Sequence, residues 1–284
     1  MSVPLQLACI FDELDPSVRK RKISNYEVLK LLCMVLQTGI PWRYLPVNGI
    51  CEWSTVYKRY QRWIKDGLFD KALQRLQIMY STKKLAEDPL WFKNIFIDCS
   101  FVKNVGGVDC LGKNPTDRGR LATKMSAIID HDQMPLSCEF FPGNMADCNI
   151  ALQTALAIKC PLRLNKRYIN VIVADKGYVS QGLMRDLANV GMGLLTPSKL
   201  RMRRRLPMSK NQKASLKCRH KVENFFCRLD KFKKIYCRHE KSIKAYRALT
   251  ALAMAILLAR HPILSTPETP TGCQETPLKP VMLS

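Results

Sequence analysis

The first quarter of the chain carries apolar residues at helical spacing. In residues 24–37, SNYEVLKLLCMVLQ, apolar positions recur every three or four residues, Ser24 can serve as N-cap, and Gly39 and Pro41 end the helix. Residues 52–67 repeat the pattern with Trp53, Val56, Tyr57, Tyr60 and Ile64 on one face, opposite Thr55, Lys58, Arg59, Arg62 and Lys65. Two helices with a tight connection, the second basic and aromatic, indicate a helix-turn-helix or, equally, a small helical subdomain with a solvated basic face.

From about residue 91 the pattern changes to short β-rich runs. The predicted strands are residues 94–102, 124–130, 136–141, 171–175 and 193–197. Helical segments at 148–157 and 181–189 separate the last three of them, and helices at 218–236 and 242–260 follow. This order predicts an α/β fold, a mixed sheet with helices packed on it. The Pro- and Thr-rich end of the chain predicts a disordered tail.

The charge balance points to a polyanionic partner. Forty-six Lys and Arg against 23 Asp and Glu give a net charge of +23, while the hydrophobic content of 47% is ordinary. Between Lys199 and Lys244, 17 basic residues stand against three acids. Such a concentration favours phosphate contacts, although a ribosomal, membrane-surface or polyphosphate role gives the same bias.

Other classes of protein are disfavoured. The 12 cysteines form no C-x-x-C pair and the four histidines form no ligand cluster, which argues against a zinc site. The first residues lack the features of a signal peptide, and the longest apolar stretch, residues 248–259, is too short to span a bilayer. We therefore expect a soluble intracellular protein with reduced thiols and no membrane partner.

Three acidic residues stand where an acid is locally unfavourable. Asp98 interrupts the apolar run IFIDCSF, Asp175 ends the run VIVAD, and Glu223 flanks the apolar stripe of a basic helix. Chemistry in open α/β sheets gathers where strand ends meet helix edges. Carboxylates gathered there repel one another unless divalent cations bind between them, and oxygen ligands suit Mg²⁺ or Mn²⁺. The pattern favours two ions, about 3.5–4 Å apart, acting on a phosphodiester.

Each acid also has a simpler interpretation. An Asp at a strand end, such as Asp175 before Lys176, is more often a helix cap, and a helical Glu among lysines is more often an ion-pair partner. Further acids compete for the metal role, namely Asp130, Asp132, Asp147 and Asp230. The order of the three acids, their element types and their basic surroundings favour the metal site.

Seven motifs together resemble one family. They are TGIPWRYLP (38–46), WSTVYKRYQRWIKDGLFDKAL (53–73), IDCSFVK (97–103), ATKMSAIID (122–130), FFPGNMAD (140–147), VIVADKGY (171–178) and KVENFFCRLDKFKKI (221–235). In this order they resemble insertion-sequence DDE transposases of the family-five kind, over roughly residues 25–260. The resemblance implies an RNase H-like catalytic domain over 89–262, a helical DNA-binding region over 1–88 and a tail over 263–284.

The resemblance also implies residue roles and partners. Asp98, Asp175 and Glu223 match the metal-binding triad, and Arg219 matches a basic residue often found four positions before the Glu. The residues expected to contact double-stranded DNA are Lys58, Arg59, Arg62, Lys65, Lys176, Arg203, Arg204, Arg205 and Arg219, three of them in a basic loop or arm at 198–217. A dimer or larger assembly is expected when DNA ends are paired. The expected location is the cytoplasm with the nucleoid in a bacterium, or the nucleus in a eukaryotic host.

The sequence departs from the family pattern at three places. Asp230 stands where a Lys is usual, seven residues after Glu223, and His239 stands where a Tyr is usual. The basic segment NPTDRGRLATK keeps only part of a Gly-rich pattern. The expected function is therefore a transposase that cuts and joins DNA, with a co-opted DNA-binding protein that has lost turnover as the alternative. A nuclease without strand transfer ranks third.

Overall fold

Four helices build the N-terminal part of the molecule. The computed structural model describes residues 3–16, 23–47, 49, 51–163, 169–197 and 208–265. The helices are α1 (Leu5–Leu14), α2 (Asn25–Thr38), α3 (Trp53–Lys65) and α4 (Leu68–Glu87), with a 3₁₀ turn η1 (Trp42–Tyr44) between α2 and α3. The predicted start of α2 is confirmed, because Ser24 and Glu27 form a capping box and Gly39 ends the helix with φ 72°.

The connection between α2 and α3 differs from the prediction. It occupies residues 39–52 and contains η1, so it is not the tight turn that the sequence suggested. Trp42 of η1 anchors this connection on α3, because its ring stacks on Tyr60 at 4.9 Å and meets Tyr57 edge-on at 5.1 Å. Trp63, which the predicted apolar face omitted, is fully buried alongside Val56 and Tyr60.

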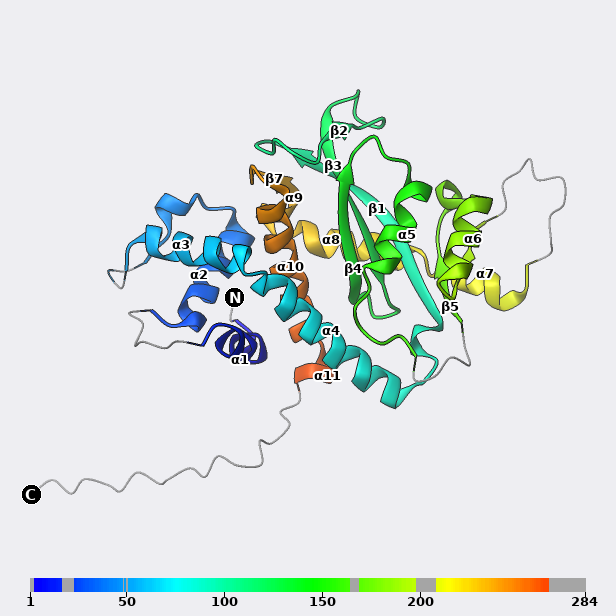
Figure 1. The fold of residues 1–284 in the computed structure, drawn as a ribbon, viewed down its shortest axis with the longest axis horizontal. Coiled ribbons are helices and arrows are strands. Elements are labelled where there is room, and N and C mark those ends of the chain that lie inside the picture. Colours follow the sequence, from blue (N-terminus) through cyan, green and yellow to red (C-terminus); the bar gives the residue numbers. More distant parts are fainter. Residues whose placement is uncertain are drawn as a thin grey trace, which may run out of the picture.

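A mixed sheet lies at the centre of the molecule (Figure 1). Its strands are β1 (Asn94–Asn104), β2 (Gly112–Lys113), β3 (Leu121–Ile129), β4 (Pro135–Pro142), β5 (Asn170–Val173), β6 (Met192–Leu195) and β7 (Cys237–Arg238). The order is β2-β3-β1-β5-β6, with β4 also on β3 and β7 also on β1. Strands β3 and β4 run antiparallel to their neighbours, whereas β5, β6 and β7 run parallel to theirs.

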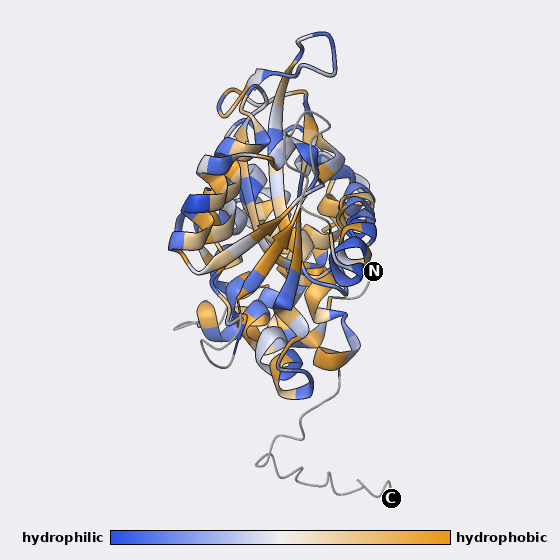
Figure 2. Cartoon of the chain, turned by 90° about the vertical axis from the view of Figure 1, so that its right-hand side faces the viewer, coloured by the Kyte–Doolittle hydropathy of each residue, from blue (hydrophilic) through white to orange (hydrophobic). Residues whose placement is uncertain are grey.

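Helices cover both faces of this sheet. Helix α5 (Asp147–Leu156) packs on β3 and β4 beside α6 (Gln181–Asn189), and α8 (His220–Asp230) packs on β1 and β3 from the opposite face (Figure 1). The apolar strands occupy the interior, and hydrophilic residues cover the outer sides of the helices (Figure 2). This arrangement confirms the predicted class, an RNase H-like mixed sheet with flanking helices after a helical N-terminal region.

One continuous core joins the N-terminal helices to the rest of the described chain. Helix α10 (Ile243–Ala259) is buried along most of its length and packs on α4. The Tyr60 hydroxyl of α3 donates a hydrogen bond to the Ala245 carbonyl of α10 at 3.1 Å. The predicted boundaries after residues 88 and 262 remain predictions. Within the described residues, no helix combines the length and apolar character that crossing a bilayer requires.

Two predictions about the basic segment before α10 need correction. The single helix predicted over 218–236 is two helices, α8 and α9 (Lys233–Tyr236), because the buried Phe232 adopts an extended backbone with ψ 105°. Residues 210–217 of the predicted basic loop form a helix, α7 (Lys210–Lys217), whose start is stabilised by a capping box between Ser209 and Gln212. Residues 198–207 lie outside the described chain, as do residues 266–284 beyond α11 (Pro262–Ser265).

Candidate active site

The register of the sheet brings Asp98 and Asp175 to the same level. Phe96 of β1 pairs with Val173 of the parallel strand β5, and each aspartate follows two residues later. Strand β5 ends at Val173, and the next partner on that edge, β7, pairs only from Lys103 onward. Among the described strands, none pairs with this edge of β1 between those points, so Asp98 lies at a gap in the sheet.

Arg219 connects Asp98 to Glu223. Its Nη1 lies 2.9 Å from Asp98 Oδ2, and its Nη2 lies 2.9 Å from Glu223 Oε1. Arg219 immediately precedes α8 and Glu223 stands in the first turn of that helix, so the guanidinium joins α8 to the centre of the sheet. The Asp98 side chain is 20% exposed and that of Glu223 is 55% exposed. The structure thus places the first and third predicted acids on one arginine.

Burial and neighbouring charges determine the protonation of Asp98. Burial raises the pKa of Asp98 to about 6, against the hydrogen bond from the Cys99 N–H and the positive charge of Arg219, which lower it. The charges of Asp175 and Asp147 raise it further. The Cys99 N–H donates to Asp98 Oδ1 at 2.8 Å at the open edge of β1. Asp98 is therefore a carboxylate whose charge needs a cation nearby.

Asp175 serves as a cap for the turn that follows it. Its Oδ1 accepts a hydrogen bond from the Gly177 N–H at 2.7 Å, which confirms the simpler interpretation at the start of the 3₁₀ turn η3 (Lys176–Tyr178). Oδ1 of Asp175 accepts this capping hydrogen bond, and the second carboxylate oxygen remains able to bind a cation. The two interpretations of Asp175 are therefore compatible.

A fourth carboxylate, Asp147, lies beside Asp175. A Cβ placed on Gly177 would be 3.0 Å from Asp175 Oδ1 and 3.5 Å from Asp147 Oδ2, so both acids border this glycine. The other oxygen of Asp147 pairs with Lys124 Nζ at 2.8 Å, and the same Nζ donates to the Met145 carbonyl at 2.6 Å. The sequence offered Asp147 only as a competitor, whereas the fold makes it a neighbour of the predicted site.

The donor set fits a hard divalent cation. The four acids supply oxygen ligands, and the nearest sulfur is a poor ligand because burial raises the pKa of the Cys99 thiol to about 12. The fit is one of ligand chemistry, because in the part of the chain that the structure describes no three His, Cys, Asp or Glu side chains lie close enough together to hold a metal, and these acids would have to move closer to bind it. Arg219 supplies the positive charge at Asp98 and Glu223, so it would compete with an ion for both acids.

The predicted DNA-binding residues of α3 divide into two groups. Lys58 and Lys65 are exposed on the helix surface. Arg59 instead donates to the Ile23 carbonyl at 2.9 Å, and Arg62 forms an ion pair with Asp15. The predicted solvated basic face is therefore wrong at Arg59, which binds the chain entering α2, whereas the Arg62 side chain stays 46% exposed beside Asp15.

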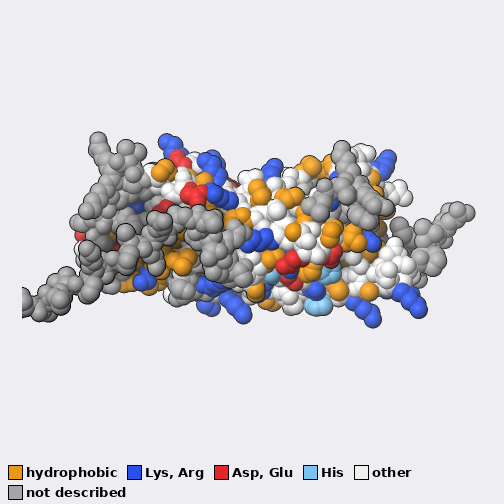
Figure 3. Space-filling view, turned by 90° about the horizontal axis from the view of Figure 1, so that it is seen from below, with side chains coloured by type: hydrophobic (Ala, Val, Ile, Leu, Met, Phe, Trp, Pro, Cys, Tyr) orange, Lys and Arg blue, Asp and Glu red, His pale blue; other side chains and the backbone are white. Residues whose placement is uncertain are grey.

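The other predicted DNA contacts lie near the acids or outside the described chain. Lys176 is exposed in the turn after Asp175, and Arg219 lies in the site itself. Arg203, Arg204 and Arg205 fall in 198–207, outside the described residues. Seen from below, Lys and Arg side chains are spread along both long edges of the molecule (Figure 3). The net positive charge is thus distributed over the surface as well as concentrated in one segment.

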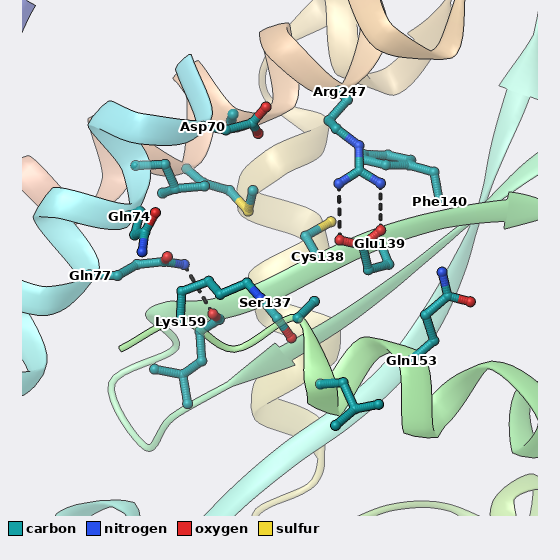
Figure 4. A pocket seen from close by; sticks show the side chains of 16 residues that line it. Asp70, Gln74, Gln77, Ser137, Cys138, Glu139, Phe140, Gln153, Lys159 and Arg247 are labelled. Carbon is teal, nitrogen blue, oxygen red and sulfur yellow. Dashed lines mark hydrogen bonds and ion pairs between the residues drawn. The ribbon is translucent and has the colours of Figure 1, made fainter. Parts of the chain in front are cut away.

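A separate pocket lies between α4, α10, α5 and strand β4 (Figure 4). Its volume is about 440 Å³. Arg247 forms a two-point ion pair with Glu139 on one wall, and Gln77 Nε2 donates to the carbonyls of Pro135 and Leu136 on another. None of the predicted site residues lines it, so this pocket is distinct from the cluster of acids.

Two family descriptions match the chain. Residues 8–73 match "Putative transposase of IS4/5 family" and residues 95–258 match "Transposase DDE domain". The chain is 32% identical over 94 residues to the "Insertion element IS402 uncharacterized 16.2 kDa protein" of Burkholderia cepacia, covering 33% of this chain and 61% of that relative. It is 25% identical over 141 residues to the "Putative transposase for insertion sequence element IS6501" of Brucella ovis, covering 49% of this chain and the whole relative.

Two solved transposase structures match this chain at low sequence identity. The catalytic domain of Mos1 mariner transposase matches with a TM-score of 0.29 and 9% identity, over 58% of this chain and 90% of that one. The piggyBac transposase synaptic complex with hairpin DNA matches with a TM-score of 0.45 and 8% identity, over 91% of this chain and 75% of that one.

Proposed function

Because the chain belongs to the family of transposases with a DDE domain, we propose that it binds the terminal repeats of a mobile DNA element, cuts the DNA there and joins the freed ends to target DNA. The observation that carries this proposal is the convergence of Asp98 and Glu223 on one guanidinium, with Asp175 at the same level of the neighbouring strand. These contacts support a single shared site for the three acids, which come from elements far apart in sequence.

We assign the metal site to Asp98, Asp175 and Glu223, with Mg²⁺ or Mn²⁺ as the ions and two as their number. Such ions, when bound, activate a water or a 3′-hydroxyl and stabilise the leaving oxygen of the phosphodiester. The burial of Asp98 keeps water away from one side of the site and strengthens its attraction for a cation. Lys124 holds Asp147 against the turn of Asp175, which orients that turn.

Arg219 has two roles in this proposal. It neutralises Asp98 and Glu223. If a metal took over these acids, its guanidinium would be able to bind a DNA phosphate with two parallel hydrogen bonds. Lys176, exposed next to Asp175, binds a neighbouring phosphate. We further propose that Arg203, Arg204 and Arg205 of the segment outside the described residues hold the backbone on either side.

The helices of residues 1–88 are proposed to recognise the element ends. Lys58, Arg62 and Lys65 stand on the outer side of α3, while Arg59 holds the entry to α2 and so positions α3. Residues 89–262 form the catalytic domain in this proposal. Joining two DNA ends requires two sets of recognition helices, so we propose that the working assembly on DNA is at least a dimer.

One observation favours the alternative, a DNA-binding protein without turnover. Asp230 is exposed at the end of α8, seven residues and therefore about two turns after Glu223. It lies on the same side of the helix as Glu223 and places a negative charge where the family usually has a Lys. Partial burial raises the pKa of this carboxyl.

Incubation of the protein with duplexes of its own element ends and Mg²⁺ tests the function. The proposal expects strand cleavage followed by joined products, and no product from Asp175→Ala at equal DNA binding. Binding without product in both wild type and Asp175→Ala contradicts the enzyme and supports the alternative. Cleavage without joined product indicates a nuclease. An Asp230→Lys variant that gains cleavage identifies Asp230 as the cause of lost turnover.

A further inference from the structure

A small basic hairpin projects from one end of the sheet. It comprises residues 112–121, from β2 to the start of β3, and we call it the basic hairpin. Lys113, Arg118 and Arg120 are exposed on it. The only acid in this segment is Asp117, which is half-buried and lies 3.9 Å from Arg120 Nη1. The hairpin therefore presents a net positive surface at the top of the molecule in Figure 1.

Hydrogen bonds to Asn114 fix the backbone of the turn that carries these cations. The side chain of Asn114 is buried, and its Oδ1 accepts from both the N–H and the hydroxyl of Thr116, at 2.9 and 2.8 Å. Its backbone N–H donates to the Arg120 carbonyl at 2.8 Å, and its carbonyl accepts from Gly119 N at 3.0 Å. These hydrogen bonds fix the backbone that carries the three cations, so less backbone entropy is lost on binding.

The base of the hairpin rests on the loop that carries Asp147. A Cβ on Gly112 would lie 2.8 Å from Gly143 N and 2.7 Å from Asn144 N, so the two backbones are in direct contact there. That loop continues through Met145 to Asp147, the carboxylate beside Asp175. The hairpin thus contacts the loop that leads to Asp147.

The separation suits one piece of duplex DNA. Strand β1 runs six residues from Asp98 to Asn104, next to the hairpin, a distance of roughly 20 Å at about 3.3 Å per residue. One turn of B-DNA spans about 34 Å. A duplex that lies along β1 with one phosphate at the acids would pass the hairpin within the same helical turn, because Asn104 lines one hollow with Asn114 and Arg120.

We propose that the basic hairpin binds the phosphate backbone of the duplex that flanks the phosphate at the acids. This inference rests on the proposed function and adds a DNA-binding surface separate from α3 and from the 198–217 segment. Lys113, Arg118 and Arg120 each neutralise a phosphate, which releases counterions and contributes affinity without reading sequence.

The test compares two triple charge reversals. Lys113→Glu with Arg118→Glu and Arg120→Glu alters the hairpin, and Lys71→Glu with Lys159→Glu and Lys244→Glu makes the same change in net charge at exposed lysines around α4 and α10. Anisotropy of a labelled duplex, titrated with protein at several salt concentrations without metal, gives the slope of log K against log salt. Arg118→Gly is a milder variant, because φ at Arg118 is 49° and glycine adopts that conformation readily.

For the hairpin triple we expect a slope smaller in magnitude by roughly 2–3, about 0.9 for each phosphate that the protein no longer neutralises. Arg118→Gly should reduce the magnitude of the slope by about 0.9 with no decrease in melting temperature, and the lysine triple should change the slope least.

Equal slopes for the two triples overturn the inference while leaving the proposed function intact. If the wild type itself fails to bind duplex, both fail. If the hairpin variants change self-association in sedimentation and not DNA binding, the inference is overturned and the hairpin binds a second copy instead.

Discussion

The Nη1 of Arg219 lies 2.9 Å from Asp98 Oδ2, and its Nη2 reaches Glu223 at the same distance. A single guanidinium therefore compensates two acids that the proposed function assigns to metal ions. A divalent cation bound by Asp98 and Glu223 would compete with this bridge for the same two carboxylates. The state of Arg219 is thus coupled to metal binding, and each of the two ligands shifts the equilibrium of the other.

Removal of this arginine should separate metal binding from cleavage. Arg219→Ala should bind Mn²⁺ about 10-fold or more tightly in calorimetry, because a hydrogen bond between charged groups worth about 1.5–3 kcal/mol no longer competes with the ion. Cleavage should fall despite the tighter binding, because no guanidinium remains there to hold a DNA phosphate. Arg185→Ala, at an exposed position on α6, is the matched control. Unchanged Mn²⁺ affinity in Arg219→Ala contradicts the coupling.

The two roles of Asp175 can be separated by one substitution. Asn accepts the hydrogen bond from the Gly177 N–H as Asp does, so Asp175→Asn should keep the cap. Its free energy of unfolding should lie within about 1 kcal/mol of that of the wild type. It lacks the charge that a divalent cation requires, so cleavage should fall by about 10³-fold or more, equivalent to about 4 kcal/mol. Urea unfolding and the cleavage assay measure the two effects. Substantial cleavage by Asp175→Asn means that Asp175 is a cap alone.

Gly177 should be sensitive to a single methyl group. An alanine Cβ there would lie 3.0 Å from Asp175 Oδ1, so close that this carboxylate must shift by a few tenths of an ångström, and at an ordinary 3.5 Å from Asp147 Oδ2. Gly177→Ala should reduce Mn²⁺ affinity and cleavage by about 10-fold, equivalent to about 1.4 kcal/mol. Gly182→Ala is the control, since its Cβ would meet Ser180 Oγ at an ordinary 3.6 Å. Equal activity in both variants contradicts the proposed packing of the acids.

The pair of Lys124 and Asp147 should be more sensitive to the removal of one partner than of both. Lys124→Met leaves the charge of Asp147 uncompensated and should cost about 2 kcal/mol of unfolding free energy. This is below the range of about 3–5 kcal/mol for a fully buried pair because Asp147 is 31% exposed. Adding Asp147→Asn should recover most of the stability. Additive effects in this double-mutant cycle mean that the two side chains do not interact.

His131 should make the folded protein sensitive to mild acid. Burial lowers the pKa of His131, the charge of Lys221 lowers it further, and Asp132 opposes them. The unfolded chain then binds more protons than the folded one below about pH 6.5, so the contribution of His131 to stability is present above that pH and is lost as pH falls. The unfolding free energy of the wild type minus that of His131→Gln should be smaller at pH 5.5 than at pH 7.5. A difference independent of pH contradicts the shift.

Local pattern was sufficient for much of the fold. The capping box of Ser24 and Glu27, the five longer strands and helices α2, α3, α5, α6 and α10 all follow from residues close together in sequence. Periodicity and capping involve residues within one or two turns of each other, so they can be recognised in the sequence without knowledge of the fold. Helix α4 was not predicted, because buried polar residues such as Gln77, Ser81 and Lys84 interrupt its apolar pattern.

The sequence by itself determined which acids are unusual, Asp98 in an apolar strand, Asp175 at a strand end and Glu223 beside an apolar helical stripe. Only the tertiary structure decided that Arg219 joins two of them, that Asp147 borders the turn of Asp175, and that Arg59 is occupied within the fold. Most of these interactions join residues that lie tens of positions or more apart in the chain. Their geometry depends on strand register and on helix packing across the sheet, which no local pattern contains.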